Sequence, residues 1–227
     1  MNLPNIKIIE LYGLPGCGKS TLTHSILSIL QSEYPGIVLR RSDISGKINK
    51  YWDRPLCLFF CLVLELLKPS NYKTKTFLLK YALSFPFNRY SIIYLLYTVM
   101  VIDLYRNNKT QIIVLDEGII QFLSSIPHDN VIKKVELIER ITNSINEIPF
   151  DALYVECQLD LDSTMYRIKQ RDKKDRFAYK DSLGELLMIK ETNLALISNA
   201  IARNKVIVDM KDSSINNAEI VINKIKQ

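Results

Sequence analysis

The feature that most constrains this chain is a glycine-rich loop that directly follows an apolar run. The loop reads Gly13-Leu14-Pro15-Gly16-Cys17-Gly18-Lys19-Ser20-Thr21, and the apolar run covers residues 6–12. The run predicts a buried strand, and apolar residues then recur at helical spacing until Tyr34-Pro35-Gly36. An ordinary glycine-rich turn is the alternative, but the position of the loop between a strand and an amphipathic helix favours a triphosphate-binding site.

The residue types of the loop indicate how it would hold an anion. Its glycines let the backbone curl with the N–H groups pointing inward, and the start of the following helix adds the positive end of its dipole. We expect Lys19 to reach the β- and γ-phosphates and the Ser20 hydroxyl to bind Mg²⁺. The predicted nucleotide-binding residues are Gly13, Gly16, Cys17, Gly18, Lys19, Ser20 and Thr21.

Length and composition favour one globular domain that spans residues 1–227. The chain has 227 residues, of which 48% are hydrophobic, and this is too many for a mainly disordered protein. The net charge of +6 suits an anionic ligand, although a solvated basic surface, nucleic acid or an acidic membrane surface would also account for it. We expect no signal peptide, and the four cysteines show no paired framework, which predicts a reducing, cytoplasmic location.

Five short β-rich runs alternate with helical patterns along the chain. They cover residues 6–12, 37–40, 111–115, 152–157 and 205–209. This alternation predicts a three-layer α/β fold in which helices cover both faces of a five-stranded parallel sheet. Ligands of such sheets bind at the carboxyl ends of the strands, so we expect every functional loop at one edge.

Residues 41–110 are too many for a simple connection and predict a helical insertion between the second and third strands. At the carboxyl edge this insertion would form an acceptor-binding wall. A helical hairpin that thickens the core or forms a homodimer interface is an equal alternative. Its apolar stretches, residues 56–67 and 92–102, are shorter than the roughly 20 residues of a membrane span. We interpret them as buried helices rather than as a membrane-associated face.

Two carboxylates follow the third predicted strand. The sequence Ile112-Ile113-Val114-Leu115-Asp116-Glu117-Gly118 has a Walker B pattern, in which a buried strand delivers acidic residues to the sheet edge. We expect Asp116 to hold Mg²⁺, and Glu117 to orient a nucleophile or to accept its proton. Capping of the following helix is a structural alternative that is compatible with these roles.

A basic segment after the fourth strand predicts a lid over residues 160–178. Arg167 and Arg171 are four residues apart, so they share one face of a helix, and Arg176 follows in a turn. Arginines that close over a nucleotide neutralise charge on the transferred group and exclude water. The alternative is a charged surface helix in which Asp172 and Asp175 form local ion pairs.

These segments together resemble the P-loop kinases of the nucleotide-kinase group, especially thymidylate kinase-like and deoxynucleoside kinase-like enzymes. The resemblance covers nearly the whole chain, and its most specific motif is the phosphate loop. It implies ATP-dependent phosphoryl transfer to a small molecule, with residues 209–214 near the adenine and with Arg41 and Asp43 facing the acceptor. The predicted catalytic residues are Lys19, Asp116, Glu117, Arg167, Arg171 and Arg176.

Two departures from the thymidylate kinases leave the acceptor open. Those enzymes usually have Asp-Arg after the third strand and Arg-Glu-Pro after the second. This chain has Asp116-Glu117 and Arg41-Ser42-Asp43 at these places. A sugar, an antibiotic or a lipid-linked compound is an alternative acceptor that the apolar insertion would suit.

Other nucleotide-binding classes fit the sequence less well. A regulatory or mechanical ATPase would explain adjacent Asp116 and Glu117, but the chain lacks an LSGGQ-type signature. A GTPase would need Asn-Lys-x-Asp, and the chain has Asn108-Lys109-Thr110-Gln111. A nucleic-acid-binding module would need a basic stripe with interleaved aromatic residues, which the sequence lacks. We therefore predict a kinase that uses ATP and Mg²⁺ and has no nucleic-acid partner.

Overall fold

The fold is described from a computed structural model at residues 8–36, 38–40, 112–118, 120–121, 152–170, 182–201 and 204–227. The chain divides into two compact units, of which one comprises Met1–Val38 and Thr110–Gln227 and the other Leu39–Lys109. The predicted insertion at residues 41–110 falls on the second unit and lies outside the described residues. The organisation as one domain with an insertion and a lid therefore stays a prediction.

The described elements alternate between strand and helix as the sequence predicts. The strands are β1 (Ile8–Gly13), β2 (Val38–Arg40), β3 (Ile112–Leu115), β4 (Ala152–Gln158) and β5 (Lys205–Asp209). The helices are α1 (Lys19–Glu33), α8 (Leu161–Lys169), α9 (Leu183–Ala200) and α10 (Ser214–Ile225). Among these described helices, none combines the length and the apolar character needed to cross a bilayer.

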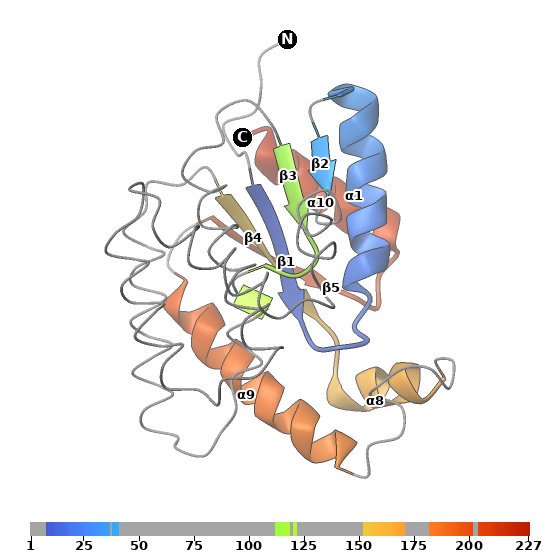
Figure 1. Ribbon diagram of the computed structural model, residues 1–227, viewed down its shortest axis with the longest axis vertical. Helices are drawn as coiled ribbons and strands as arrows, with labels where there is room; N and C mark the ends of the chain where they lie inside the picture. The colour runs from blue at the N-terminus through green and yellow to red at the C-terminus, as the bar shows by residue number, and fades with distance from the viewer. Residues whose placement is uncertain are drawn as a thin grey trace, which may run out of the picture. The chain divides into compact units, whose positions relative to one another are not determined.

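The sheet has β1 between β3 and β4, in the strand order β2-β3-β1-β4-β5 (Figure 1). Pairing is parallel between β3 and β1, between β1 and β4 and between β4 and β5. The prediction of a parallel α/β sheet is confirmed for these four strands, and the direction of the three-residue β2 stays a prediction. The next two strands along the chain, β2 and β3, lie on one side of β1, and the last two, β4 and β5, lie on the other side. The loop that follows β1 is therefore at the point where such sheets bind ligands.

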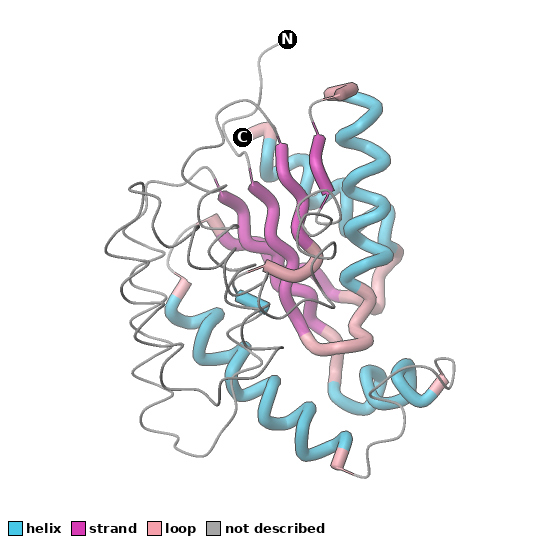
Figure 2. The backbone as a smooth tube through the Cα atoms, in the orientation of Figure 1, coloured by secondary structure: helices cyan, strands magenta, loops and turns pink. Residues whose placement is uncertain are grey.

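Helices cover both faces of the sheet. Figures 1 and 2 show α1 and α10 together against one face and α9 against the other. The alternation of side chains along β1 agrees with this arrangement, because Ile9 and Leu11 belong to the core formed with α1 and α10. Tyr12 points to the opposite face, where its hydroxyl lies 3.5 Å from Oγ of Ser198 in α9.

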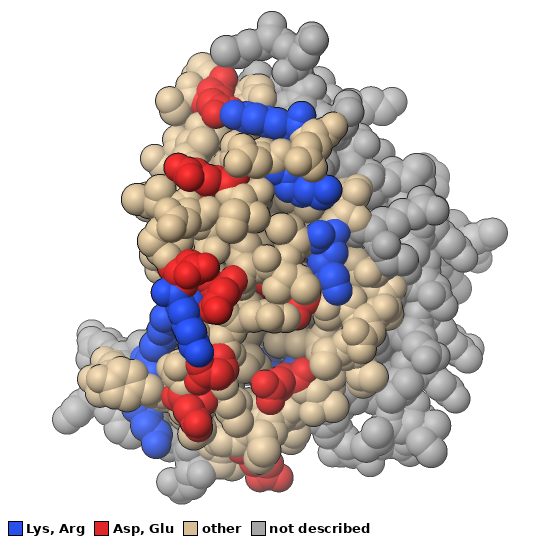
Figure 3. All heavy atoms as spheres, turned by 180° about the vertical axis from the view of Figure 1, so that it is seen from behind, with Lys and Arg blue, Asp and Glu red and all other residues tan. Residues whose placement is uncertain are grey.

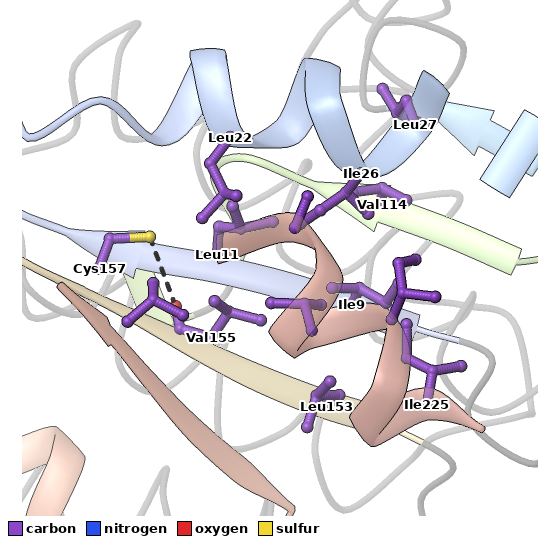
Figure 4. Close-up of a cluster of buried hydrophobic side chains, with 14 of the residues drawn as sticks. Ile9, Leu11, Leu22, Ile26, Leu27, Val114, Leu153, Val155, Cys157 and Ile225 are labelled. Carbon is purple, nitrogen blue, oxygen red and sulfur yellow. Dashed lines mark hydrogen bonds between the residues drawn. The ribbon is translucent and has the colours of Figure 1, made fainter. Parts of the chain in front are cut away.

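The layer between the sheet and the helices α1 and α10 is an apolar core (Figure 4). Its members come mainly from the strands β1, β3 and β4 and from both helices, and each is at most 8% exposed. They include Ile9, Leu11, Leu22, Ile26, Val114, Leu153, Val155, Val221, Ile222 and Ile225. Full burial of one such side chain contributes roughly 1.5–3 kcal/mol, so this layer is a main source of stability for the unit that carries the loop.

Candidate functional site

The phosphate loop is held between β4 and α8 by close approaches at two glycines. Gly13 pairs with Cys157 in the β1–β4 register, and an added Cβ at Gly13 would lie 3.2 Å from Cβ of Cys157. Gly16 has a φ of +87°, and an added Cβ there would lie 2.7 Å from Cγ1 of Ile168 in α8. A side chain at either position would displace its neighbour, so the loop needs glycine to stay in this place.

The helix α1 begins without a side-chain cap. Its N-cap residue is Gly18, in the left-handed region with a φ of 113°, and the first turn contains no acidic residue. Ser20 and Thr21 in this turn are exposed. The positive end of the helix dipole is thus available to an anion, while the N–H groups of Cys17 and Thr21 donate to carbonyl oxygens of the loop.

The ammonium group of Lys19 lies within the loop itself. Lys19 is only 9% exposed, and its Nζ donates hydrogen bonds to the carbonyl oxygens of Gly13 at 3.0 Å and Leu14 at 2.9 Å. An ammonium has three donors and no acceptor, so these bonds position a full positive charge at the loop. The role of Lys19 in binding the β- and γ-phosphates stays a prediction.

Arg167 of α8 connects the loop to the segment after β5. Its Nη1 donates to the carbonyl oxygen of Cys17 at 2.9 Å, and its Nη2 donates to that of Met210 at 3.1 Å. The sequence predicts Arg167 in a lid and residues 209–214 near the nucleotide base, and the structure brings both to the phosphate loop. The other predicted arginines, Arg171, Arg176 and Arg41, lie outside the described residues, as does Asp43.

Two cysteines meet beside the loop. Cys17 and Cys157 both lie against Gly13, and both are buried and free of disulfide bonds. Sγ of Cys157 donates to the carbonyl oxygen of Val155 at 3.9 Å. The interaction with Cys157 and the positive charges of Lys19 and Arg167 hold the pKa of Cys17 below its usual range. The interaction with Cys17 and burial raise the pKa of Cys157. Cys157 is a neighbour of the loop that the sequence did not reveal.

The predicted Walker B carboxylates lie where the sequence places them, directly after β3. All four residues of β3 are buried, and Asp116 and Glu117 are half-buried at its carboxyl end. Sequence reasoning missed Glu10 and Gln121, two buried polar residues near this point. Glu10 was detectable as a lone acid within an apolar run, whereas nothing in the sequence distinguishes Gln121.

The oxygen donors at this edge fit Mg²⁺. Ser20 offers a hydroxyl at the start of α1, and Asp116 offers a carboxylate after β3. In the part of the chain that the structure describes, no group of three or more His, Cys, Asp or Glu residues gathers as a metal site. Mg²⁺ usually takes one or two protein ligands and completes its shell with water and phosphate oxygens, so a small donor set of hard oxygens is appropriate.

A cavity of about 420 Å³ adjoins the loop. The carboxyl ends of β1, β4 and β5 and the helix α9 bound it, and its lining contains the carboxylates Glu156, Asp160, Glu191 and Asp209. Lys211, also in the lining, forms an ion pair with Asp160 at 3.0 Å. Carboxylates repel phosphates, so this cavity suits hydroxyl or amino groups better than it suits a triphosphate.

The floor of this cavity is a hydrogen-bonded network. Oη of Tyr12 donates to Glu156 at 3.1 Å, and Oγ of Ser198 donates to the same carboxylate oxygen. Lys205 donates to the carbonyl oxygen of Ser198 at 2.9 Å and lies 3.8 Å from Glu156. Burial raises the pKa of Tyr12, and the hydroxyl therefore stays protonated as a donor.

The surface charge of the described residues is mixed in sign. Figure 3 shows Lys and Arg interspersed with Asp and Glu on the face opposite to that of Figure 1. Lys211 pairs with Asp160 at 3.0 Å, and Lys226 pairs with Glu33 at 2.7 Å. Part of the basic charge is therefore neutralised by local ion pairs.

Comparison with known proteins identifies the fold. No protein-family model matches the chain, and no curated protein matches its sequence. The chain is similar to shikimate kinase from Acinetobacter baumannii in complex with shikimate, with a TM-score of 0.52 and 12% identity over 99% of this chain and 93% of that one. It is also similar to deoxyadenosine kinase from M. mycoides with bound dATP, with a TM-score of 0.55 and 15% identity over 97% of this chain and 100% of that one.

The chain therefore has an α/β fold similar to that of these two kinases. The predicted α/β fold is confirmed at this level. The more specific resemblance to thymidylate kinases stays a prediction.

Proposed function

We propose that this chain is a P-loop kinase that transfers the γ-phosphate of ATP to a small-molecule acceptor. The observation that carries the proposal is the convergence of positive groups on one loop. The uncapped start of α1, the ammonium of Lys19 and the guanidinium of Arg167 all meet there. Such a set of donors suits a triphosphate, and the fold shared with two kinases supports transfer rather than binding alone.

Each residue of the site has a role that follows from its chemistry. Lys19 would bind the β- and γ-phosphates, while Ser20 and Asp116 would hold Mg²⁺, which neutralises phosphate charge when it is bound. Glu117 would accept the proton of the attacking hydroxyl. The arginines of the lid would close over the transferred group and exclude water, and these are Arg167, Arg171 and Arg176.

The acceptor would carry a hydroxyl group. Shikimate and dATP occupy the two similar structures, and in this chain we assign acceptor binding to the insertion at residues 41–110, including Arg41 and Asp43. Nucleosides and nucleotides are the first candidates because of the resemblance to nucleotide kinases. A sugar or a lipid-linked compound is the second, because the insertion contains two apolar stretches.

Hydrolysis of ATP without an acceptor is the competing activity. A regulatory or assembly ATPase would use Glu117 next to Asp116 to activate water instead of an acceptor hydroxyl. The two activities differ in one measurable property, which is whether an added acceptor accelerates ADP release.

A coupled ADP-release screen tests the proposal directly. Purified protein with MgATP would be assayed against nucleosides, nucleoside monophosphates, sugars and polyprenols, with the Lys19→Ala variant as the control for contaminating kinases. We expect at least one class to raise ADP release in the wild type alone. A constant rate with every acceptor would indicate an ATPase, and no release above the control would contradict both activities.

A further inference from the structure

Two buried polar side chains outside the predicted site join β1 to the segment after β3. The backbone N–H of Ile120 donates to Oε1 of Glu10 at 2.6 Å, and the backbone N–H of Gly13 donates to Oε1 of Gln121 at 3.1 Å. Glu10 is 0% exposed and Gln121 is 8% exposed. The two bonds run in opposite directions, so each segment holds the backbone of the other.

Gly118 shows how closely the two segments approach. An added Cβ at Gly118 would lie 2.6 Å from both carboxylate oxygens of Glu10, which is closer than real Cβ contacts. The carboxylate of Glu10 thus fills the space that a side chain would need. Gly118 directly follows Glu117 and comes two residues after Asp116, so the turn that carries these acids rests on Glu10.

We propose that Glu10 and Gln121 form a two-way clamp that fixes Asp116 and Glu117 relative to the phosphate loop. They are positioning residues, and the inference rests on the proposed function. Gly13 opens the loop that contains Lys19, so one end of the clamp acts on the nucleotide-binding loop and the other on the carboxylates. Displacement of catalytic groups by about 1 Å is enough to lower turnover about 10²-fold, which gives such a clamp a measurable effect.

The hydrogen bond of Gly13 can be tested without any ligand. Gln121→Met keeps the length of the side chain and removes the acceptor, whereas Gln121→Glu keeps an acceptor oxygen. We expect the Gly13 amide to exchange with solvent deuterium about tenfold faster in Gln121→Met than in the wild type, because a buried donor loses its partner. Gln121→Glu should restore most of the protection, and equal Gly13 exchange in all three proteins would overturn the clamp.

A second pair of variants tests the other half of the clamp. Gly118→Ala forces the Glu10 carboxylate to move, whereas Gly184→Ala adds a Cβ whose nearest neighbour among the described residues is Sδ of Met165 at 3.7 Å. We expect faster exchange of the Ile120 amide in Gly118→Ala and no change in Gly184→Ala. Unchanged Ile120 exchange in Gly118→Ala would overturn this half of the proposal.

Calorimetry with ATP separates positioning from general damage. The ratio of ATP affinity with Mg²⁺ to that without Mg²⁺ should fall about fivefold or more in Gly118→Ala, since this variant displaces Asp116 while Lys19 remains. A similar loss with and without Mg²⁺ would indicate plain structural damage and would contradict positioning. If wild-type protein fails to bind MgATP, the proposed function is wrong, and this failure is distinct from unchanged exchange at Gly13 and Ile120.

Discussion

The two faces of the sheet bury different kinds of side chain, and β1 contributes to both. Ile9 and Leu11 enter the apolar core under α1 and α10, while Glu10 and Tyr12, which alternate with them, are buried on the opposite face. Each of these polar groups has a partner, since Glu10 accepts from the backbone and Tyr12 donates to Glu156. Buried polar groups are tolerated when they are hydrogen-bonded. The side chains of β1 therefore contribute to the stability of the fold on one face of the sheet and to the candidate site on the other.

The variant expected to show this difference most clearly is Lys19→Ala, at the carboxyl edge of the sheet. Removal of the ammonium should abolish phosphoryl transfer while the fold stays intact, because the side chain bonds only the loop backbone and a thiol in the contacts described. Calorimetry with MgATP and circular dichroism would measure both properties. Lys224→Ala, an exposed lysine on α10, is the matched control. Undiminished MgATP affinity and turnover in Lys19→Ala would show that the site assignment is wrong.

The next largest effect is expected for Arg167→Ala. Arginines that stabilise the transferred group contribute about 10³ or more to phosphoryl transfer, so turnover should fall by about that factor. The bridge between Cys17 and Met210 would also be lost. Arg167→Lys keeps the charge but not the bidentate geometry of the guanidinium. Its turnover in a steady-state assay should lie between those of the wild type and Arg167→Ala. Normal turnover in Arg167→Ala would leave α8 as a charged surface helix.

The two Walker B acids should separate kinetically. Glu117→Gln should lower the rate constant about 10²-fold with nucleotide affinity nearly kept, because a general base acts only in the chemical step. Asp116→Asn should instead raise the Mg²⁺ concentration needed for half-maximal activity. Full activity in both variants would leave helix capping as the remaining role of these acids.

On the apolar face the effect should be on stability instead. Leu11→Ala removes a fully buried side chain and should lower the free energy of unfolding by about 2–5 kcal/mol in urea titrations. MgATP affinity well below the unfolding midpoint should stay near that of the wild type. Ile207→Ala, at a site that is 50% exposed, is the control and should lower the free energy of unfolding by much less. A large loss of affinity in Leu11→Ala would show that the two faces are not separable.

The smallest effect concerns Asp160, which caps α8. Its carboxylate accepts the backbone N–H of Ser163 at 2.7 Å and pairs with Lys211, and the pKa of Asp160 is lowered to about 2, first by the Ser163 hydrogen bond. A depressed pKa means that the stabilisation is present above about pH 4 and is lost as the pH falls toward about 2. Asp160→Asn should therefore reduce the acid dependence of unfolding.

The matched control for this measurement is Asp162→Asn. It removes one charge from the same first turn of α8 but leaves the cap of Asp160 in place. Unfolding curves recorded at several pH values between about 2 and 5 would compare the three proteins. Identical acid dependence in the wild type and Asp160→Asn would contradict the stabilising role of the cap.

The local sequence was sufficient to predict the positions of the strands and of the phosphate loop. The apolar runs predicted β1, β3 and β4 to within about two residues at each end, because a parallel strand buried on both faces is a largely apolar segment. The run at residues 205–209 also predicted β5, although β5 is only partly buried. The loop was predictable because glycines, Lys19 and Ser20 lie at fixed spacings in the chain. The Walker B acids followed from their position after a buried strand.

Contacts between distant segments were not predictable. Cys157 lies beside Cys17, Arg167 reaches Met210, and Gln121 reaches Gly13, although each pair is far apart in the sequence. These contacts depend on the order and register of the strands, which a single sequence specifies only through the whole fold. Glu10 stands out in the sequence as an acid within an apolar run. Its partner, the backbone N–H of Ile120, could not be predicted, because this contact depends on the whole fold.

The packing of α1 on α10 has a consequence for how the protein is made. Oγ of Ser25 in α1 and Oγ of Ser214 in α10 are 3.1 Å apart, although 189 positions separate them along the chain. During synthesis on the ribosome, the phosphate loop is therefore made early and the helix α10 is made late. Until α10 emerges, the part of the apolar side of α1 that packs on α10 lacks its partner and is open to chaperones. Nucleotide binding should begin only once synthesis has passed α10, and a chain released earlier would contain the whole motif without the support that shapes it.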